Sequence, residues 1–162
     1  MLLIPQVLLY TGVRVQELVN IKIQDIDFDF CQIRINSGKG SKDRIVPFPI
    51  NFRETLMLYA KNEKTSGAVF LFESNRKKAF TTRGVRKILA GYAKKAEMEK
   101  SLSPHKLRHF LFTWLKKQGI DDSLIQPYSG HATRQSLEIY SKLSLADSQK
   151  IYDEVIHKFP IK

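Results

Sequence analysis

Cysteine is almost absent from this sequence, in which Cys31 is the only one among 162 residues. A single cysteine excludes an intrachain disulfide and any metal site built from several cysteines. A chain without disulfides is typical of a reducing compartment, so we expect a cytoplasmic protein.

Long apolar segments are absent too. The most apolar stretch, MLLIPQVLLY at residues 1–10, is too short to span a bilayer and lacks the basic start of a secretion signal. We therefore expect neither a membrane segment nor an export signal. Internal repeats, low-complexity tracts and evident linkers are also lacking, and an apolar content of 43% predicts one folded domain.

Acidic residues are few, since 16 Asp and Glu stand against 27 Lys and Arg, which gives a net charge of +11. Such an excess favours a polyanionic partner such as nucleic acid. Net charge leaves open the alternative of a basic protein with no such partner, because charge does not determine a fold.

The spacing of apolar residues predicts a chain that is mostly helical. We expect one helix to start at Thr81 or Thr82, another to run from Pro104 to Gly119, and further helices over residues 2–10, 13–21, 51–62, 121–128, 135–140 and 146–158. Period-two alternation predicts three strands, around residues 26–30, 32–36 and 44–48. These patterns together indicate an α+β fold, mostly helical with a small three-stranded antiparallel sheet.

Local signals refine these expectations. The glycine-rich SGKGSKD at residues 37–43 is predicted to be a hairpin tip, and residues 68–72 a short strand or extended segment. Asn51, followed three residues later by Glu54, resembles a capping box, and Ser103 before a proline is a strong helix start. The apolar side of the helix after Ser103 is predicted to consist of Leu107, Phe110, Leu111 and Trp114.

Four segments hold the residue types that metal-free phosphodiester exchange needs: a nucleophile, cations around the phosphate oxygens, and a proton donor. They are TGVRVQEL at 11–18, GKGSKDRIVP at 38–47, SPHKLRH at 103–109 and SGHATRQSLEIY at 129–140. Each is weak evidence alone. In this order, and spread over nearly the whole chain, they resemble the motifs of the tyrosine recombinases of the phage integrase family.

The resemblance implies a catalytic set that acts on DNA. Tyr140, nine residues after His131, is expected to be the nucleophile. Arg14 and Arg108 are expected to clamp the scissile phosphate, where a planar guanidinium can donate two hydrogen bonds. His131 is expected to hydrogen-bond the same phosphate.

Three further residues have supporting or proton-transfer roles in this resemblance. Lys39, at the hairpin tip, is expected to protonate the departing 5′ oxygen, and His105 to accept and donate protons near the reacting oxygens. Glu17 is expected to orient Arg14 from the same helical face. An ordinary intrahelical ion pair is the alternative reading for Glu17.

Other basic residues are predicted to contact DNA. Lys42 lies on the same tip as Lys39, which is favoured as the proton donor because GKG is the matched feature. The remaining predicted DNA contacts are Arg44, Arg83, Arg86 and Lys87. A solvated basic surface is the alternative for all of them.

The resemblance implies the fold shared by tyrosine recombinases and type IB topoisomerases, with no metal or cofactor. The expected activity is site-specific recombination, for a phage or mobile element, through a 3′-phosphotyrosine. Relaxation of the topoisomerase kind and a DNA-binding remnant that no longer cleaves are the alternatives.

The resemblance also bears on organisation. Residues 1–162 are expected to be one catalytic domain that lacks the family's N-terminal core-binding domain and first catalytic-domain helix. The full-length protein is expected to form a homotetramer on double-stranded DNA, and the isolated domain to be a monomer. Whether the helix over 146–158 packs on its own chain or on a neighbour stays open.

Overall fold

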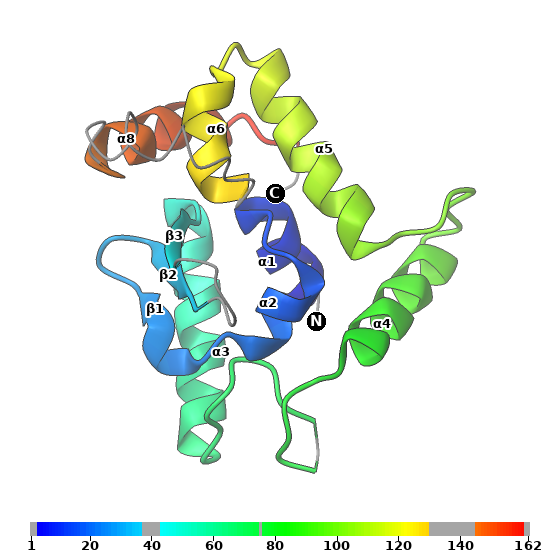
Figure 1. Cartoon of the computed structure of the whole chain (residues 1–162). Helices are drawn as coiled ribbons and strands as arrows, with labels where there is room; N and C mark the ends of the chain where they lie inside the picture. Colours follow the sequence, from blue (N-terminus) through cyan, green and yellow to red (C-terminus); the bar gives the residue numbers. More distant parts are fainter. Residues whose placement is uncertain (1–2, 37–42, 75, 130–144, 161–162) are drawn as a thin grey trace.

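The computed structural model describes residues 3–36, 43–74, 76–129 and 145–160 (Figure 1). Within these ranges helices surround a small antiparallel sheet, which confirms the predicted fold class. The predicted hairpin tip, apart from Asp43, and the predicted helix over 135–140 lie outside them.

The sheet has the order β1-β2-β3, with β1 at Ile26–Asp27, β2 at Gln32–Ile35 and β3 at Arg44–Pro47. Ile33 in the central strand pairs with Ile26 on one side and Val46 on the other. All three side chains are buried, so this face of the sheet belongs to the core.

The strand predicted over 26–30 is wrong beyond Asp27. The Asp27 carboxylate Oδ1 accepts hydrogen bonds from the backbone N–H groups of Asp29 and Phe30, both at 3.0 Å. Such a side-chain acceptor folds the backbone into a turn instead of a ladder. Cys31 then adopts a left-handed φ of 51° before β2 begins.

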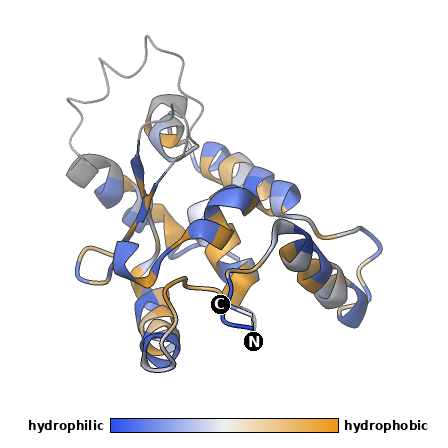
Figure 2. Ribbon diagram, turned by 60° about the horizontal axis from the view of Figure 1, so that its bottom comes forward, coloured by the Kyte–Doolittle hydropathy of each residue, from blue (hydrophilic) through white to orange (hydrophobic). Residues whose placement is uncertain are grey.

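Helix α1, Leu3–Thr11, lies at the centre of the molecule, and nearly all of its side chains are buried. Helix α5, Pro104–Lys117, packs along it, and helix α2, Val15–Asn20, follows it after a short turn. On α5, Leu107, Leu111 and Leu115 are buried whereas Lys116 and Lys117 are exposed, and Figure 2 shows hydrophobic and hydrophilic residues alternating along the helices. This burial of amphipathic faces is what stabilises the arrangement.

Helix α3, Arg53–Thr65, starts later than predicted, and the capping box at Asn51 and Glu54 is wrong. A 3₁₀ turn, η2 at Ile50–Phe52, precedes the helix, and the N–H of Phe52 bonds the carbonyl of Pro49 at 2.9 Å. Asn51 therefore lies inside a turn that is already helical, and no side chain caps α3.

The chain next crosses to α4, Thr82–Lys95, through the predicted extended segment. Phe70 forms a bridge with Lys22, just before the short 3₁₀ turn η1 at Ile23–Asp25. Thr81 caps α4, because its hydroxyl accepts a hydrogen bond from the N–H of Gly84 at 3.0 Å. The predicted cap is confirmed.

Helix α5 begins as predicted, with the Ser103 hydroxyl accepting from the N–H of Lys106 at 3.3 Å and Pro104 at its first position. Its predicted core stripe is wrong at Phe110, whose side chain is 44% exposed. Phe110 lies toward the edge of the packed face, where its ring meets that of Phe159 at 5.8 Å.

Helices α6, Asp122–Ser129, and α8, Leu145–Ile156, complete the described structure. Helix α8 packs on its own chain: Tyr152 is buried and its hydroxyl donates a 2.8 Å hydrogen bond to the carbonyl of Tyr10 in α1. The tail helix thus completes the core of the chain to which it belongs. None of the described helices is both long and apolar enough to cross a membrane.

Candidate active site

Arg14 lies at the turn between α1 and α2. Gly12 adopts a left-handed φ of 63°, which lets the chain reverse after α1. Arg14 then occupies the N-cap position of α2, and its backbone N–H donates to Glu17 Oε2 at 2.6 Å. Its guanidinium meets Glu17 Oε1 at 3.2 Å, and the side chain is 46% exposed.

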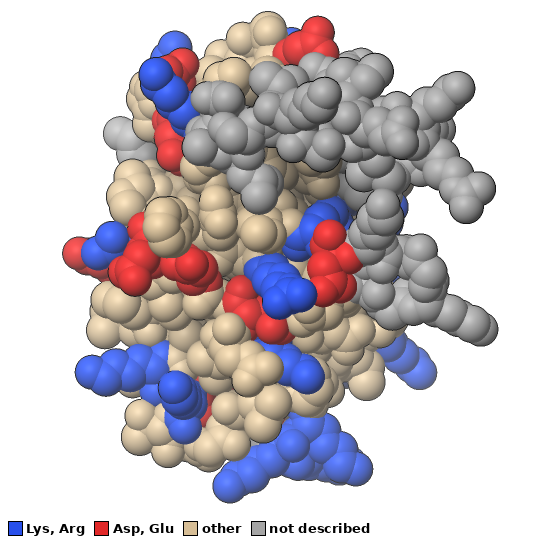
Figure 3. All heavy atoms as spheres, turned by 60° about the vertical axis from the view of Figure 1, so that its left-hand side comes forward, with Lys and Arg blue, Asp and Glu red and all other residues tan. Residues whose placement is uncertain are grey.

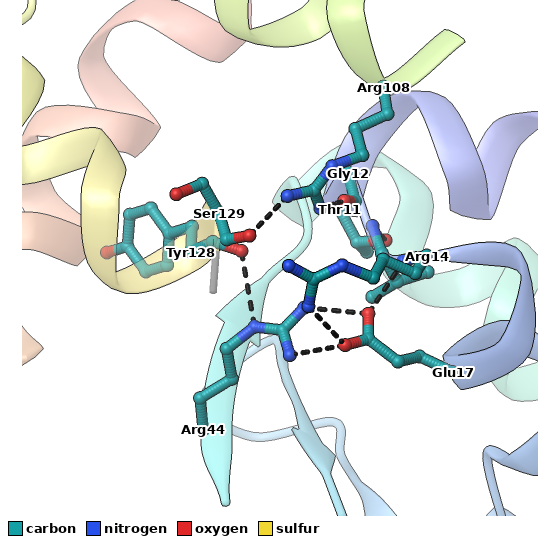
Figure 4. Close-up of polar contacts among 9 residues, drawn as sticks. Thr11, Gly12, Arg14, Glu17, Arg44, Arg108, Tyr128 and Ser129 are labelled. Carbon is teal, nitrogen blue, oxygen red and sulfur yellow. Dashed lines mark hydrogen bonds and ion pairs between the residues drawn. The ribbon is translucent and has the colours of Figure 1, made fainter. Parts of the chain in front are cut away.

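Arg44 approaches the same carboxylate from the sheet. Its Nη1 and Nη2 donate to the two oxygens of Glu17, each at 2.7 Å (Figure 4). Its Nε donates to the carbonyl of Tyr128, near the end of α6, at 3.3 Å. The side chains of Arg44 and Glu17 are 12% and 10% exposed, so this pair is largely shielded from water.

Arg108 is buried, with only 8% of the residue exposed. Its guanidinium donates to the backbone carbonyls of Gly12 and Ser129, and so links the end of α1 to the end of α6 (Figure 4). It also lies over the ring of Phe112, 4.8 Å from the centroid, in a cation–π contact. The end of α1, the end of α6 and a ring of its own helix α5 therefore fix its position.

The cluster carries more positive than negative charge, because Arg14 and Arg44 both pair with the Glu17 carboxylate and the charge of Arg108 lies close to them. Burial lowers the pKa of Arg108 to about 10, and the nearby charges of Arg14 and Arg44 act in the same direction. Arg108 still stays protonated at neutral pH. The site is thus suited to an anion that has several acceptor oxygens, such as a phosphate diester.

The pKa of Glu17 depends on burial and on the neighbouring arginines as well. Burial alone raises its pKa, but hydrogen bonds from Arg44 and from the N–H of Arg14, with both positive charges, outweigh burial and lower it. The carboxylate is therefore ionised at neutral pH.

A Glu17→Gln variant is expected to be less stable than wild type at pH 7 by about 1.5–3 kcal/mol, the usual contribution of hydrogen bonds to a charged group. Because the folded-state pKa is lowered, the carboxylate stabilises the fold above its unfolded pKa of about 4.3, and this contribution is lost as the pH falls through the folded pKa. Urea unfolding between pH 3 and 7 should show that the difference in free energy of unfolding between wild type and Glu17→Gln becomes smaller as the pH falls. Glu99→Gln, at an exposed loop position, is the control, and an equal gap at every pH would contradict the assignment.

The other predicted residues are placed as follows. His105 is exposed in the first turn of α5, three residues before Arg108. Arg83, Arg86 and Lys87 are exposed on α4, which packs against α2. Lys39, Lys42, His131 and Tyr140 lie outside the described residues, so the roles predicted for them stay predictions.

The charged surface agrees with a basic chain that also carries local ion pairs. On the face seen in Figure 3, lysine and arginine side chains gather along the lower edge, and acidic side chains lie among basic ones in the middle. One such exposed pair is Arg34 with Asp43, at 2.9 Å on neighbouring parts of the sheet.

Sequence reasoning missed three features of the site. The carbonyls of Gly12 and Ser129 and the ring of Phe112 hold Arg108, and Arg44 holds Glu17. Backbone carbonyls leave no trace in a sequence. The only signal for Arg44 was its place in the matched segment GKGSKDRIVP.

The chain is similar in sequence to known proteins. The model of the phage integrase family matches residues 2–146. Tyrosine recombinase XerC from Staphylococcus aureus is 39% identical over 149 residues, which are 90% of this chain and 50% of XerC. The chain thus spans about half the length of such curated relatives.

Two solved structures are also similar. The XerA recombinase superposes with a TM-score of 0.75 at 34% identity, over 97% of this chain and 57% of XerA. The XerH site-specific recombinase, solved bound to a palindromic difH substrate after cleavage, gives a TM-score of 0.69 at 25% identity, over 95% of this chain and 44% of XerH. With the family model matching most of the sequence and the fold shared, the chain belongs to the phage integrase family.

Proposed function

We propose that this chain is the DNA-cleaving and rejoining domain of a site-specific recombinase. One observation carries the proposal: Arg14 and Arg108, from segments far apart in sequence, meet in a cluster whose positive charge exceeds that of its one carboxylate. Charged donors arranged before the reaction stabilise a phosphate transition state strongly, because they need no reorganisation.

In the proposed reaction the Tyr140 oxygen attacks the scissile phosphorus and forms a 3′-phosphotyrosine, and the 5′ oxygen leaves. A free phenol has a pKa of about 10, so the arginines must stabilise its anion together with the transition state. His131 hydrogen-bonds the phosphate, His105 moves protons near the reacting oxygens, and Lys39 protonates the leaving oxygen. In the reverse step a new 5′-hydroxyl attacks the 3′-phosphotyrosine, which rejoins the strand and releases Tyr140. The energy of the original phosphodiester bond is thus kept in the phosphotyrosine.

Double-stranded DNA is the proposed partner. XerH, which this fold resembles, was solved with its DNA substrate, and the exposed cations of α4 offer phosphate contacts of the kind that supply affinity without sequence information. We also propose that four copies assemble on DNA in the whole protein, with a DNA-clamping domain beside residues 1–162, in a reducing cytoplasm.

The test is a nicked suicide duplex, taken from DNA flanking the gene, that traps the cleaved strand. Wild type is expected to give a covalent protein–DNA band on a denaturing gel, and Tyr140→Phe is expected to give none, because phenylalanine lacks the attacking oxygen. Tyr59→Phe, on α3, is the matched control and should keep the band.

Other outcomes favour other functions. A band that survives Tyr140→Phe would exclude this nucleophile. Absence of any band, from the chain alone and from the chain joined to a DNA-clamping domain, would favour a DNA-binding module that does not cleave. Religation only to the original strand would favour topoisomerase-like relaxation.

A further inference from the structure

Each of the three guanidinium nitrogens of Arg44 donates a hydrogen bond within the protein. Nη1 and Nη2 bond the two oxygens of Glu17, and Nε bonds the carbonyl of Tyr128. Burial does not set Arg44 apart, because Arg108 is shielded to a similar degree. The difference is that the charge of Arg44 is paired with the Glu17 carboxylate, whereas the two acceptors that Arg108 bonds are uncharged carbonyls. A direct phosphate contact, as predicted from the sequence, is not what this geometry favours.

The orientation of the Glu17 carboxylate is determined mainly by Arg44. The two Arg44 contacts are 2.7 Å each and form the planar, two-pronged pairing that fixes a carboxylate most firmly. The Arg14 guanidinium reaches the same carboxylate through a longer contact of 3.2 Å. Glu17 therefore guides Arg14 from a position that Arg44 defines.

Charge balance gives Arg44 a second effect. If Arg44 were removed, the shielded Glu17 carboxylate would have Arg14 as its nearest cation. A closer pairing of these two would turn Arg14 donors toward Glu17 and away from a phosphate. Arg44 thus satisfies a carboxylate that would otherwise compete with the substrate.

The third contact of Arg44 reaches the end of α6. The carbonyls of Tyr128 and Ser129 accept hydrogen bonds from Arg44 and Arg108 respectively, where carbonyls lack partners within the helix and attract cations. Gly130 and His131 follow directly in the sequence. Arg44 and Arg108 therefore hold Tyr128 and Ser129, which precede the predicted phosphate ligand His131 in the sequence.

We propose that Arg44 is a positioning residue of the phosphate site, which holds Glu17 so that Arg14 faces the scissile phosphate and anchors the end of α6 beside Arg108. This inference rests on the proposed function. It assigns Arg44 a role through other residues and not through contact with DNA.

Single-turnover cleavage of the suicide duplex tests this role. Arg44→Met is expected to slow covalent-complex formation at saturating DNA about 10²-fold, as a misplaced reacting group does. Arg44→Lys keeps the charge but loses the two-pronged pairing, so a loss of about 10-fold is expected. The DNA dissociation constant should rise by no more than about 10-fold, because Arg14 is one of many phosphate contacts, and thermal unfolding must show that both variants are folded.

A double-mutant cycle with Glu17→Gln tests the route of the effect. If Arg44 acts through Glu17, Arg44→Met combined with Glu17→Gln should be about as slow as the slower single variant. If the rate loss of the double variant equals the product of the two single losses, Arg44 and Glu17 act independently and the inference is overturned. An Arg44→Met protein with the wild-type cleavage rate would overturn it as well.

A binding measurement separates this inference from the proposed function. Side-chain NMR signals of the arginines, titrated with inorganic phosphate, should show binding in wild type and about 10-fold weaker binding in Arg44→Met. Arg34→Met removes an exposed arginine of the same sheet and should bind like wild type. If wild type makes no covalent complex, the proposed function fails, whereas equal phosphate binding by wild type and Arg44→Met overturns the positioning role.

Discussion

Arg108→Ala is expected to slow DNA cleavage by about 10²–10³-fold or more, the usual cost of one donor that stabilises a transition state. DNA binding is expected to weaken only partly, because the other cations predicted to contact the DNA backbone would remain. Single-turnover formation of the covalent complex, at saturating suicide duplex, measures the effect. Lys117→Ala removes an exposed cation from the same helix and should leave the rate within about 2-fold of wild type, well below the 10²-fold loss expected of a transition-state donor.

The same substitution is expected to lower the free energy of unfolding. It leaves the carbonyls of Gly12 and Ser129 without the guanidinium that they now bond, and each buried acceptor left unsatisfied costs about 1–3 kcal/mol. A total of about 2–6 kcal/mol by urea unfolding would agree with this structure. Cleavage at the wild-type rate would remove Arg108 from the proposed phosphate clamp.

Gly12→Ala is expected to destabilise the fold by about 2–5 kcal/mol, the sum of a backbone cost and a packing cost. The φ of 63° at Gly12 is costly for any residue with a Cβ, by about 1–2 kcal/mol. A Cβ there would lie 2.7 Å from Cζ of Phe112 and 3.1 Å from Cδ2 of Leu111, and overpacking of this kind adds about 1–3 kcal/mol. Urea unfolding monitored by circular dichroism measures the loss.

Gly91→Ala is the matched control and should have the opposite sign. Gly91 lies within α4, and a Cβ there would meet nothing within 4 Å. Alanine in place of glycine in an open helical position stabilises by about 0.5–1 kcal/mol. Equal effects of the two substitutions would contradict the strained turn at Gly12.

Displacement of Phe112 should also disturb Arg108, so cleavage by Gly12→Ala is expected to fall.

Features that depend on neighbouring residues in the sequence were predicted well. Thr81 and Ser103 cap their helices as expected, because a cap is formed by a side chain and an amide three residues away. The capping box at Asn51 failed because a turn after Pro49 started the helical path earlier. Phe110 was assigned to the core by periodicity alone, which does not tell how wide the packed face is.

The sequence predicted which residues belong to the candidate site better than it predicted which atoms they contact. The motifs singled out Arg14, Glu17 and Arg108. In the structure Arg14 pairs with the Glu17 carboxylate, and Arg108 bonds the ends of α1 and α6 beside them. Partners that come from distant segments were not predictable, because they depend on how the helices approach each other. Arg44 is the clearest case, since a basic residue beside a hairpin tip suggested DNA and the fold directs it to Glu17.

The central place of α1 has a consequence for how the chain folds during synthesis. Its buried faces meet partners that come much later: Arg108 lies 96 residues after Gly12, and Tyr152 lies 142 residues after Tyr10. At about 5–20 residues per second, a ribosome needs roughly 5–20 s to add the first of these partners. During that interval only earlier partners, such as α2, β3 and Phe52, can cover this apolar helix. Part of it stays exposed, so a chaperone that binds this segment should raise the yield of folded protein.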